Sequence, residues 1–148
     1  MLIGNASSGM VLMHAEVTEN PHVATRPFRV NAGALSLYIL LANGKTKYLS
    51  EVKAGDEVLI VSRAGKTRKA IVVRNKIEWR PMLLIEAKSS AGTEVKTIAQ
   101  DAETIRVVCP KGTKSVAELK PGDEIVVRAT AAEARHFGMK VDERIIEQ

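Results

Sequence analysis

Short apolar runs rich in β-branched residues recur along the chain, separated by turns that contain glycine or asparagine. Runs of this kind at intervals of about 8–12 residues are typical of all-β domains. Asn43-Gly44 lies directly after one of these runs and predicts a hairpin turn. The pattern predicts strands at 36–42, 45–50, 56–63, 69–79, 81–89, 93–99, 103–109, 123–129 and 141–147. We therefore predict an all-β, mostly antiparallel and barrel-like fold.

Helical patterns are few. Only 130–138 has the composition for one or two helical turns, with Gly138 as the stop signal, so we expect at most one or two short helices. A chain of 148 residues with 45% hydrophobic and 26% charged residues has the length and composition of one globular domain. We treat 1–148 as that single domain.

The sequence contains an internal repeat. The segment "YLSEVKAGDEVLIV" at 48–61 matches "SVAELKPGDEIVVR" at 115–128 with an offset of 67 residues. In both, a Lys-x-Gly-Asp turn precedes an apolar run: the glycine permits the turn and the aspartate can bond nearby amides. The repeat predicts a duplicated β unit, at approximately 31–79 and 101–147, and a structural role for its turns.

The net charge is +5, and all of the surplus lies after residue 44. Nucleic-acid binders cluster their basic residues and often add aromatic platforms, but aromatic residues make up only 3% of this chain. Charge therefore does not single out nucleic acid. A small basic module that contacts RNA or docks a partner domain remains the alternative to an enzyme.

The sequence also gives signals about the cellular compartment. Cys109 is the only cysteine, which excludes an internal disulfide and fits a reducing cytosol. No stretch approaches the ~20 apolar residues of a membrane span, and the apolar start has no basic residues before it, unlike a signal peptide. We expect a cytoplasmic protein without a membrane partner.

A polar run, "HAEVTENPHVATRPFRVNAG" at 14–33, has neither helical nor strand periodicity. Its two prolines restrict the backbone, and such loops often carry function. Arg26 and Arg29 suit bidentate binding of a carboxylate or phosphate. Pairing of each arginine with Glu16 or Glu19 as a structural bridge is the alternative.

Two further groups of polar residues lie near the start of the chain. His14 and Glu16 are two apart in a predicted strand at 11–17, which would place them on one face with Leu12 as an acid/base pair. His22 and His136 would be needed to complete a metal set with them, but the spacing does not require a metal and we predict none. The loop "GNASSG" at 4–9 can present amides and hydroxyls to an anion, or can be a plain turn.

Several blocks together resemble the archaeal-type (type II) 3-dehydroquinate synthase. The specific parts are "GNASSG…HAE…ENP…RPFRVNAG" and the closing "RHFGMKVDERIIE", and the similarity covers essentially the whole chain. The resemblance implies that the chain is the C-terminal part of a longer enzyme, with an N-terminal catalytic part as its partner. A homo-oligomer is compatible with it.

The resemblance also implies a reaction. Members of this family use NAD to deaminate 2-amino-3,7-dideoxy-D-threo-hept-6-ulosonate oxidatively and cyclise the product to 3-dehydroquinate, in the shikimate route to aromatic amino acids. This chemistry needs a base, an acid and a cation for the substrate carboxylate. No NAD site is located in this chain.

The residue chemistry within these blocks assigns the roles. We predict that His14 and Glu16 transfer protons and that Arg26 or Arg29 holds the carboxylate. The predicted partners of substrate hydroxyl and carbonyl oxygens are Asn5, Ser7, Ser8, Asn20 and Asn31.

Overall fold

The computed structural model describes residues 1–5, 8–17, 28–129, 134–136 and 139–141. Within these residues, every secondary-structure element is a β-strand or a short 3-10 helix. The strands are β1 (Leu2–Asn5), β2 (Gly9–Leu12), β3 (Tyr38–Leu40), β4 (Thr46–Tyr48), β5 (Glu57–Val61), β6 (Thr67–Ile71), β7 (Met82–Lys88), β8 (Glu94–Gln100), β9 (Arg106–Val108), β10 (Thr113–Ser115), β11 (Val127–Ala129), β12 (Ala134–His136) and β13 (Met139–Val141). The helices are η1 (Leu49–Glu51) and η2 (Val116–Glu118).

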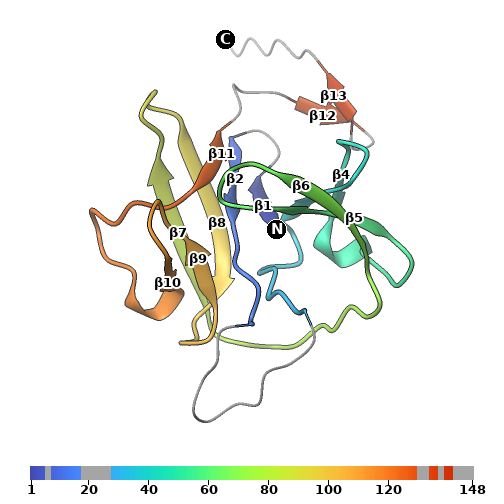
Figure 1. Ribbon diagram of the computed structural model, residues 1–148, viewed down its shortest axis with the longest axis horizontal. Coiled ribbons are helices and arrows are strands. Elements are labelled where there is room, and N and C mark those ends of the chain that lie inside the picture. Colours follow the sequence, from blue (N-terminus) through green and yellow to red (C-terminus); the bar gives the residue numbers. More distant parts are fainter. Residues whose placement is uncertain (6–7, 18–27, 130–133, 137–138, 142–148) are drawn as a thin grey trace, which may run out of the picture.

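The strands form one larger antiparallel sheet and several hairpins (Figure 1). The sheet has the order β11-β2-β1-β3-β4, and β5–β6, β7–β8, β9–β10 and β12–β13 are two-stranded. The β7–β8 hairpin packs against β1 and β2 through β8. The predicted all-β, antiparallel class is therefore confirmed.

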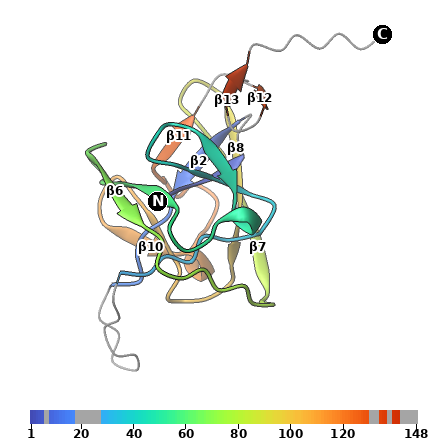
Figure 2. The same ribbon diagram turned by 90° about the vertical axis from the view of Figure 1, so that its right-hand side faces the viewer.

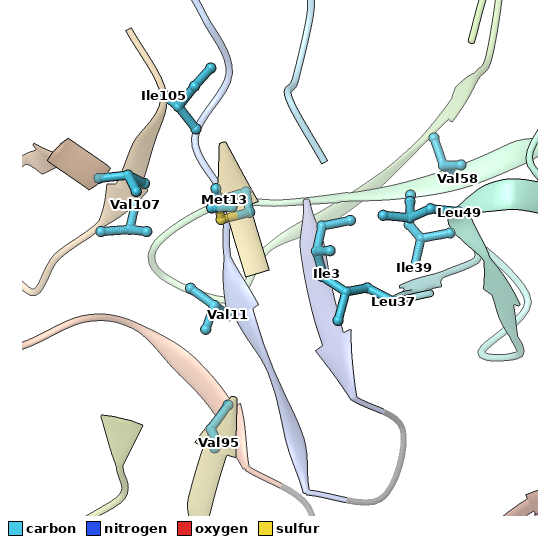
Figure 3. Close-up of a cluster of buried hydrophobic side chains, with 12 residues drawn as sticks. Ile3, Val11, Met13, Leu37, Ile39, Leu49, Val58, Val95, Ile105 and Val107 are labelled. Atoms are coloured by element: carbon cyan, nitrogen blue, oxygen red, sulfur yellow. The ribbon is translucent and has the colours of Figure 1, made fainter. Parts of the chain in front are cut away.

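The β1–β2 hairpin is buried on both of its faces. Ile3, Val11 and Met13 belong to one cluster of buried side chains (Figure 3), whereas Leu2 and Leu12 belong to a second. Successive side chains of a strand point to opposite faces, so this hairpin separates two regions of the core. This arrangement explains why residues 10–13 are a continuous apolar run and not an alternating one.

The two repeat segments contain the same series of elements. Strands β4 and β10 each lead directly into a 3-10 helix, and a Lys-x-Gly-Asp turn follows each helix. The first unit joins the sheet through β3 beside β1, and the second joins it through β11 beside β2. The β1–β2 hairpin therefore lies between the two units.

Each unit is closed by the same ion pair. The Lys47 ammonium donates to both carboxylate oxygens of Asp56, at 2.9 and 2.8 Å, and the Lys53 backbone N–H donates to Asp56 Oδ2 at 2.9 Å. Lys114, Asp123 and Lys120 form the equivalent contacts in the second unit. The hydrogen bond from the lysine ammonium is the main reason that the pKa of each aspartate lies below its usual range.

Some predicted boundaries are wrong. Strand β2 ends at Leu12, and Glu16 lies in a bend, so 11–17 is not one strand. Strand β6 ends at Ile71, because its partner β5 begins at Glu57 opposite it, and the predicted strand 69–79 stops there. Strand β11 covers only the last part of the predicted 123–129.

The predicted helix at 130–138 is also wrong where the structure describes it. Residues Ala134–His136 form β12, which pairs with β13, and backbone pairing across a hairpin replaces the helical bonds that the composition favoured. The short helices lie instead at 49–51 and 116–118. Most of the predicted strand 141–147 lies outside the described residues. In the described part of the chain, no helix is long and apolar enough to cross a membrane.

The lysine–aspartate pairs predict a dependence of stability on pH. The pKa of Asp56 is lower in the folded chain than in the unfolded chain, so there is a range of pH in which this carboxyl is ionised only when the chain is folded. The contribution of Asp56 to the free energy of unfolding is therefore present above about pH 4, and it is lost as the pH falls through the folded pKa. Asp56→Asn should lower the thermal midpoint at pH 7 by on the order of 2 °C, and this difference should disappear towards pH 2. Thermal unfolding followed by circular dichroism across this range measures the effect.

Asp101→Asn is the matched control, because no described hydrogen bond or ion pair engages the exposed Asp101 side chain. It should follow the unsubstituted chain at every pH. A difference between Asp56→Asn and the unsubstituted chain that stays constant down to pH 2 would contradict the assigned role of the ion pair.

Candidate functional site

A polar cavity of about 180 Å³ lies where the end of the 14–33 run meets the segment after β6. Residues 29–33 form one wall, and residues 74–78 form another. Gln100, the last residue of β8, also lines the cavity. Its charged and amide lining residues are Arg29, Asn31, Arg74, Asn75, Lys76, Glu78 and Gln100.

Contacts with β8 hold the first wall. The Asn31 side-chain amide donates to Gln100 Oε1 at 2.7 Å, and the Ala34 backbone N–H donates to Ile98 O at 3.1 Å. Gly33 lies between them with a φ of 96°, and a Cβ placed on it would be 2.1 Å from Ile98 O. Glycine is therefore required here, both for the backbone conformation and for the close approach.

The second wall is held by Asn75. Its side-chain amide donates to the carbonyl oxygens of Val52 at 2.8 Å and Leu49 at 3.4 Å, beside the end of η1. The backbone N–H of Val72 also bonds to Asp56 O at 2.9 Å, within the first Lys-x-Gly-Asp turn. These contacts position the neighbouring Arg74 at the cavity.

The charges around the cavity are mostly positive. Three basic side chains, those of Arg29, Arg74 and Lys76, line it together with one carboxylate, Glu78. The pKa of Glu78 lies below its usual range, mainly because Lys76 donates a hydrogen bond to its carboxylate. Arg80 Nη2, 3.2 Å from Glu78 Oε1, lowers this pKa further. Lys76 is thus paired, whereas no ion pair or hydrogen bond with another described residue engages the Arg74 side chain.

Arg29, which lines this cavity, lies close to Glu16. Arg29 Nε and Glu16 Oε1 are 3.4 Å apart, and the Glu16 backbone N–H donates to Arg29 O at 2.7 Å. Glu16 Oε1 is buried and accepts no hydrogen bond from the described residues, so this contact is an ion pair without hydrogen-bond geometry. Arg29 and Arg74 together provide N–H donors that suit a carboxylate or phosphate.

His14 does not line this cavity. Its backbone N–H donates to Arg106 O at 2.9 Å, and its Nδ1 is buried without a partner among the described residues. Burial is the main cause that lowers the pKa of His14, and the charge of Arg106 lowers it further, so the imidazole is neutral at pH 7. In the described part of the chain, no three His, Cys, Asp or Glu residues gather to hold a metal ion.

The whole of this chain, residues 1–148, matches the family model of the 3-dehydroquinate synthase II C-terminal domain. The chain belongs to this family. Its relatives include a 3-dehydroquinate synthase of Methanocaldococcus jannaschii, 57% identical over 149 residues, and a 3-dehydroquinate synthase homolog of Aquifex aeolicus, 54% identical over 149 residues. All of this chain is matched in both, but it covers only 41% and 44% of their lengths. No solved structure matches the chain.

The structure brings some of the predicted site residues of this C-terminal domain together. Arg29 and Asn31 line the cavity, and Glu16 contacts Arg29. Asn5 and Ser8 lie at the closed end of the β1–β2 hairpin, opposite the end where Met1 and Met13 pair, and they do not line the cavity. Ser7, Asn20 and Arg26 lie outside the described residues, as does His22.

The predicted shared face of Leu12, His14 and Glu16 is wrong. The strand ends at Leu12, and the backbone N–H of Glu16 pairs with Arg29 and not with a neighbouring strand of the sheet. His14 and Glu16 therefore do not form a pair set by strand alternation. Their catalytic roles, and the binding roles of the other residues, remain predictions.

The sequence interpretation missed Arg74, Asn75 and Gln100. Residues 69–79 read as a single strand, in which Arg74 is one of several exposed basic residues. Only the tertiary contacts of Asn75 and Gln100 bring these residues to the cavity. The one signal in the sequence was the density of basic residues in 63–80.

Gly33 gives a direct test of how this cavity is built. Gly33→Ala should lower the free energy of unfolding by about 2 kcal/mol or more, because strain at positive φ adds to the clash of the new Cβ with Ile98 O. Denaturant unfolding measures the change. Gly44→Ala is the matched control: its φ is 80°, but nothing lies within 4 Å of the added Cβ, so about 1 kcal/mol is expected. Equal costs at both positions would contradict the close approach.

Proposed function

We propose that this chain is the C-terminal part of a 3-dehydroquinate synthase and that its polar cavity binds the carboxylate of the substrate. The observation that carries the proposal is the placement of Arg29 and Arg74 at one small cavity, with no described hydrogen bond occupying their side-chain donors. The basic lining residues Arg29, Arg74 and Lys76 would attract an anionic substrate to this cavity.

The amides around the two arginines suit the rest of a polyhydroxylated substrate. Asn31 uses its amino group on Gln100, and Asn75 uses its amino group on Val52 and Leu49. The oxygens of Asn31 and Asn75 and the amino group of Gln100 then remain as acceptors and a donor for hydroxyl groups. A small hydroxy acid would therefore find two cations for its carboxylate and amides for its oxygens.

Within this proposal the reaction is the oxidative deamination of 2-amino-3,7-dideoxy-D-threo-hept-6-ulosonate, followed by cyclisation to 3-dehydroquinate. Both relatives described above carry the synthase name, which supports the reaction class. The role of this chain is to orient the substrate by its carboxylate. Glu16, 3.4 Å from Arg29, keeps that arginine in place.

NAD does not fit this cavity. Its volume of about 180 Å³ is below the ~300–1,000 Å³ of pockets that enclose larger ligands, and the sequence has no G-x-G-x-x-G loop. NAD would supply the hydride acceptor of the reaction. We assign to this cavity the binding of the substrate carboxylate and not of NAD.

The proposal predicts the kinetics of arginine variants. The enzyme to use is a fused synthase in which this chain replaces the matching part of the Methanocaldococcus jannaschii protein. Arg74→Gln and Arg29→Gln should each raise KM for the amino-ulosonate about 10- to 100-fold, because a hydrogen bond to a charged group contributes roughly 1.5–3 kcal/mol. NADH formation at a series of substrate concentrations measures KM.

Arg80→Gln is the control, since Arg80 pairs with Glu78 and does not line the cavity. Its KM should stay within about twofold of the unsubstituted enzyme, as expected for loss of an exposed ion pair. Unchanged KM in both the Arg29 and the Arg74 variants would exclude this cavity as the carboxylate site.

A further inference from the structure

Exposed apolar side chains are concentrated in one part of the chain. Of the eleven exposed large hydrophobic residues in the described part, four lie between residues 71 and 79: Ile71, Val73, Ile77 and Trp79. Trp79 is 99% exposed, Val73 87% and Ile71 65%. Large exposed apolar groups that cluster in this way mark interaction surfaces.

These side chains belong to a segment that is held in place. Asn75 fixes its middle to η1 through the carbonyl oxygens of Val52 and Leu49. The backbone of Val72 bonds on both sides to the first Lys-x-Gly-Asp turn, through Gly55 and Asp56. The segment thus presents its apolar side chains from a defined backbone, which lowers the entropic cost of binding a partner.

A groove of about 440 Å³ lies beside the polar cavity and is lined mainly by apolar side chains. Ile71 and Val73 form part of its lining, with Ile60 of β5 and Phe28. Met1 also lines the groove, and Figures 1 and 2 both show the N-terminus beside the β5–β6 hairpin. Any polypeptide that precedes Met1 in a longer chain would therefore start beside this groove.

We propose that this groove, together with Ile71, Val73 and Trp79, is the docking surface for the part of the synthase that precedes this domain. The family is defined as a C-terminal domain, and the Methanocaldococcus jannaschii relative is much longer, with only 41% of its length covered. In a protein of that length, the large preceding part would be covalently linked to Met1, beside this exposed apolar surface. Tryptophan is enriched among the residues that dominate binding energy, and burial of one covers about 150–250 Å².

The position of the groove gives this docking a consequence for the site. Arg29 and Arg74 line both the groove and the polar cavity. A partner seated in the groove would close over the cavity and bring its own groups to the substrate. In this respect the inference rests on the proposed function, because it completes the same site.

The test uses the fused synthase described above, with a protease site inserted just before Met1. After cleavage, the two parts should remain associated in sedimentation velocity at micromolar concentration. Hydrogen exchange of 71–80 should be slower in the uncleaved fused synthase than in the 148-residue chain alone. The double variant Ile71→Ser/Trp79→Ser should weaken the association at least tenfold.

Leu84→Ser is the matched control. Leu84 is 60% exposed, similar to Ile71, but it lines a different groove, between β7 and residues 116–127. This variant should leave the affinity within about twofold. Association is measured without substrate, so its result is separate from whether Arg74 binds a carboxylate.

Three results would overturn the docking surface. The first is separation of the two parts after cleavage. The second is that Leu84→Ser weakens their association while the double variant does not, which would assign docking to the other groove. The third is self-association of the 148-residue chain that the double variant abolishes, which assigns the surface to a second copy. Circular dichroism of each variant shows that the fold is retained, as expected for exposed side chains.

Discussion

Burial of the β1–β2 hairpin on both faces is the constraint on which the rest of the structure depends. Ile3 and Val11, which pair across the hairpin, are fully buried, and burial of each side chain contributes roughly 1.5–3 kcal/mol. One repeated unit joins β1 and the other joins β2, so each unit depends on the hairpin for its place in the sheet. The β7–β8 hairpin packs against the same two strands. The core in Figure 3 is therefore shared by parts of the chain that are far apart in sequence.

The features that the sequence predicted well are local. The Asn43-Gly44 turn joins β3 and β4, and the two Lys-x-Gly-Asp turns form the same contacts in both units. In these turns, the side chain that stabilises the backbone lies within a few residues of its partner. The repeat is visible in the sequence because its turn and the following apolar run recur together.

The features that the sequence did not reveal depend on long-range contacts. Strand β6 ends at Ile71, opposite the first residue of β5, and nothing in 69–79 marks that position. Arg29 and Asn31 were predicted from their residue types, but Arg74 and Gln100 required the packing of residues 31–34 on β8 and of Asn75 on η1. The prediction that His14 and Glu16 share a strand face was wrong because an apolar run that is buried on both sides gives no sign of where its strand ends.

The basic character of the chain has a local origin that bears on how the domain acts. Residues 63–80 carry seven basic side chains and one carboxylate, a surplus of six that exceeds the net charge of +5 of the whole chain. The same stretch contains Ile71, Val73 and Trp79, which are exposed. Arg74 and Trp79 lie on this one anchored segment, and in the described part of the chain the Arg74 side chain has no ion-pair or hydrogen-bond partner while Trp79 is exposed. An anionic substrate under a covering protein surface would satisfy both, because excluding water strengthens the interaction of the arginines with the anion while the apolar side chains are buried.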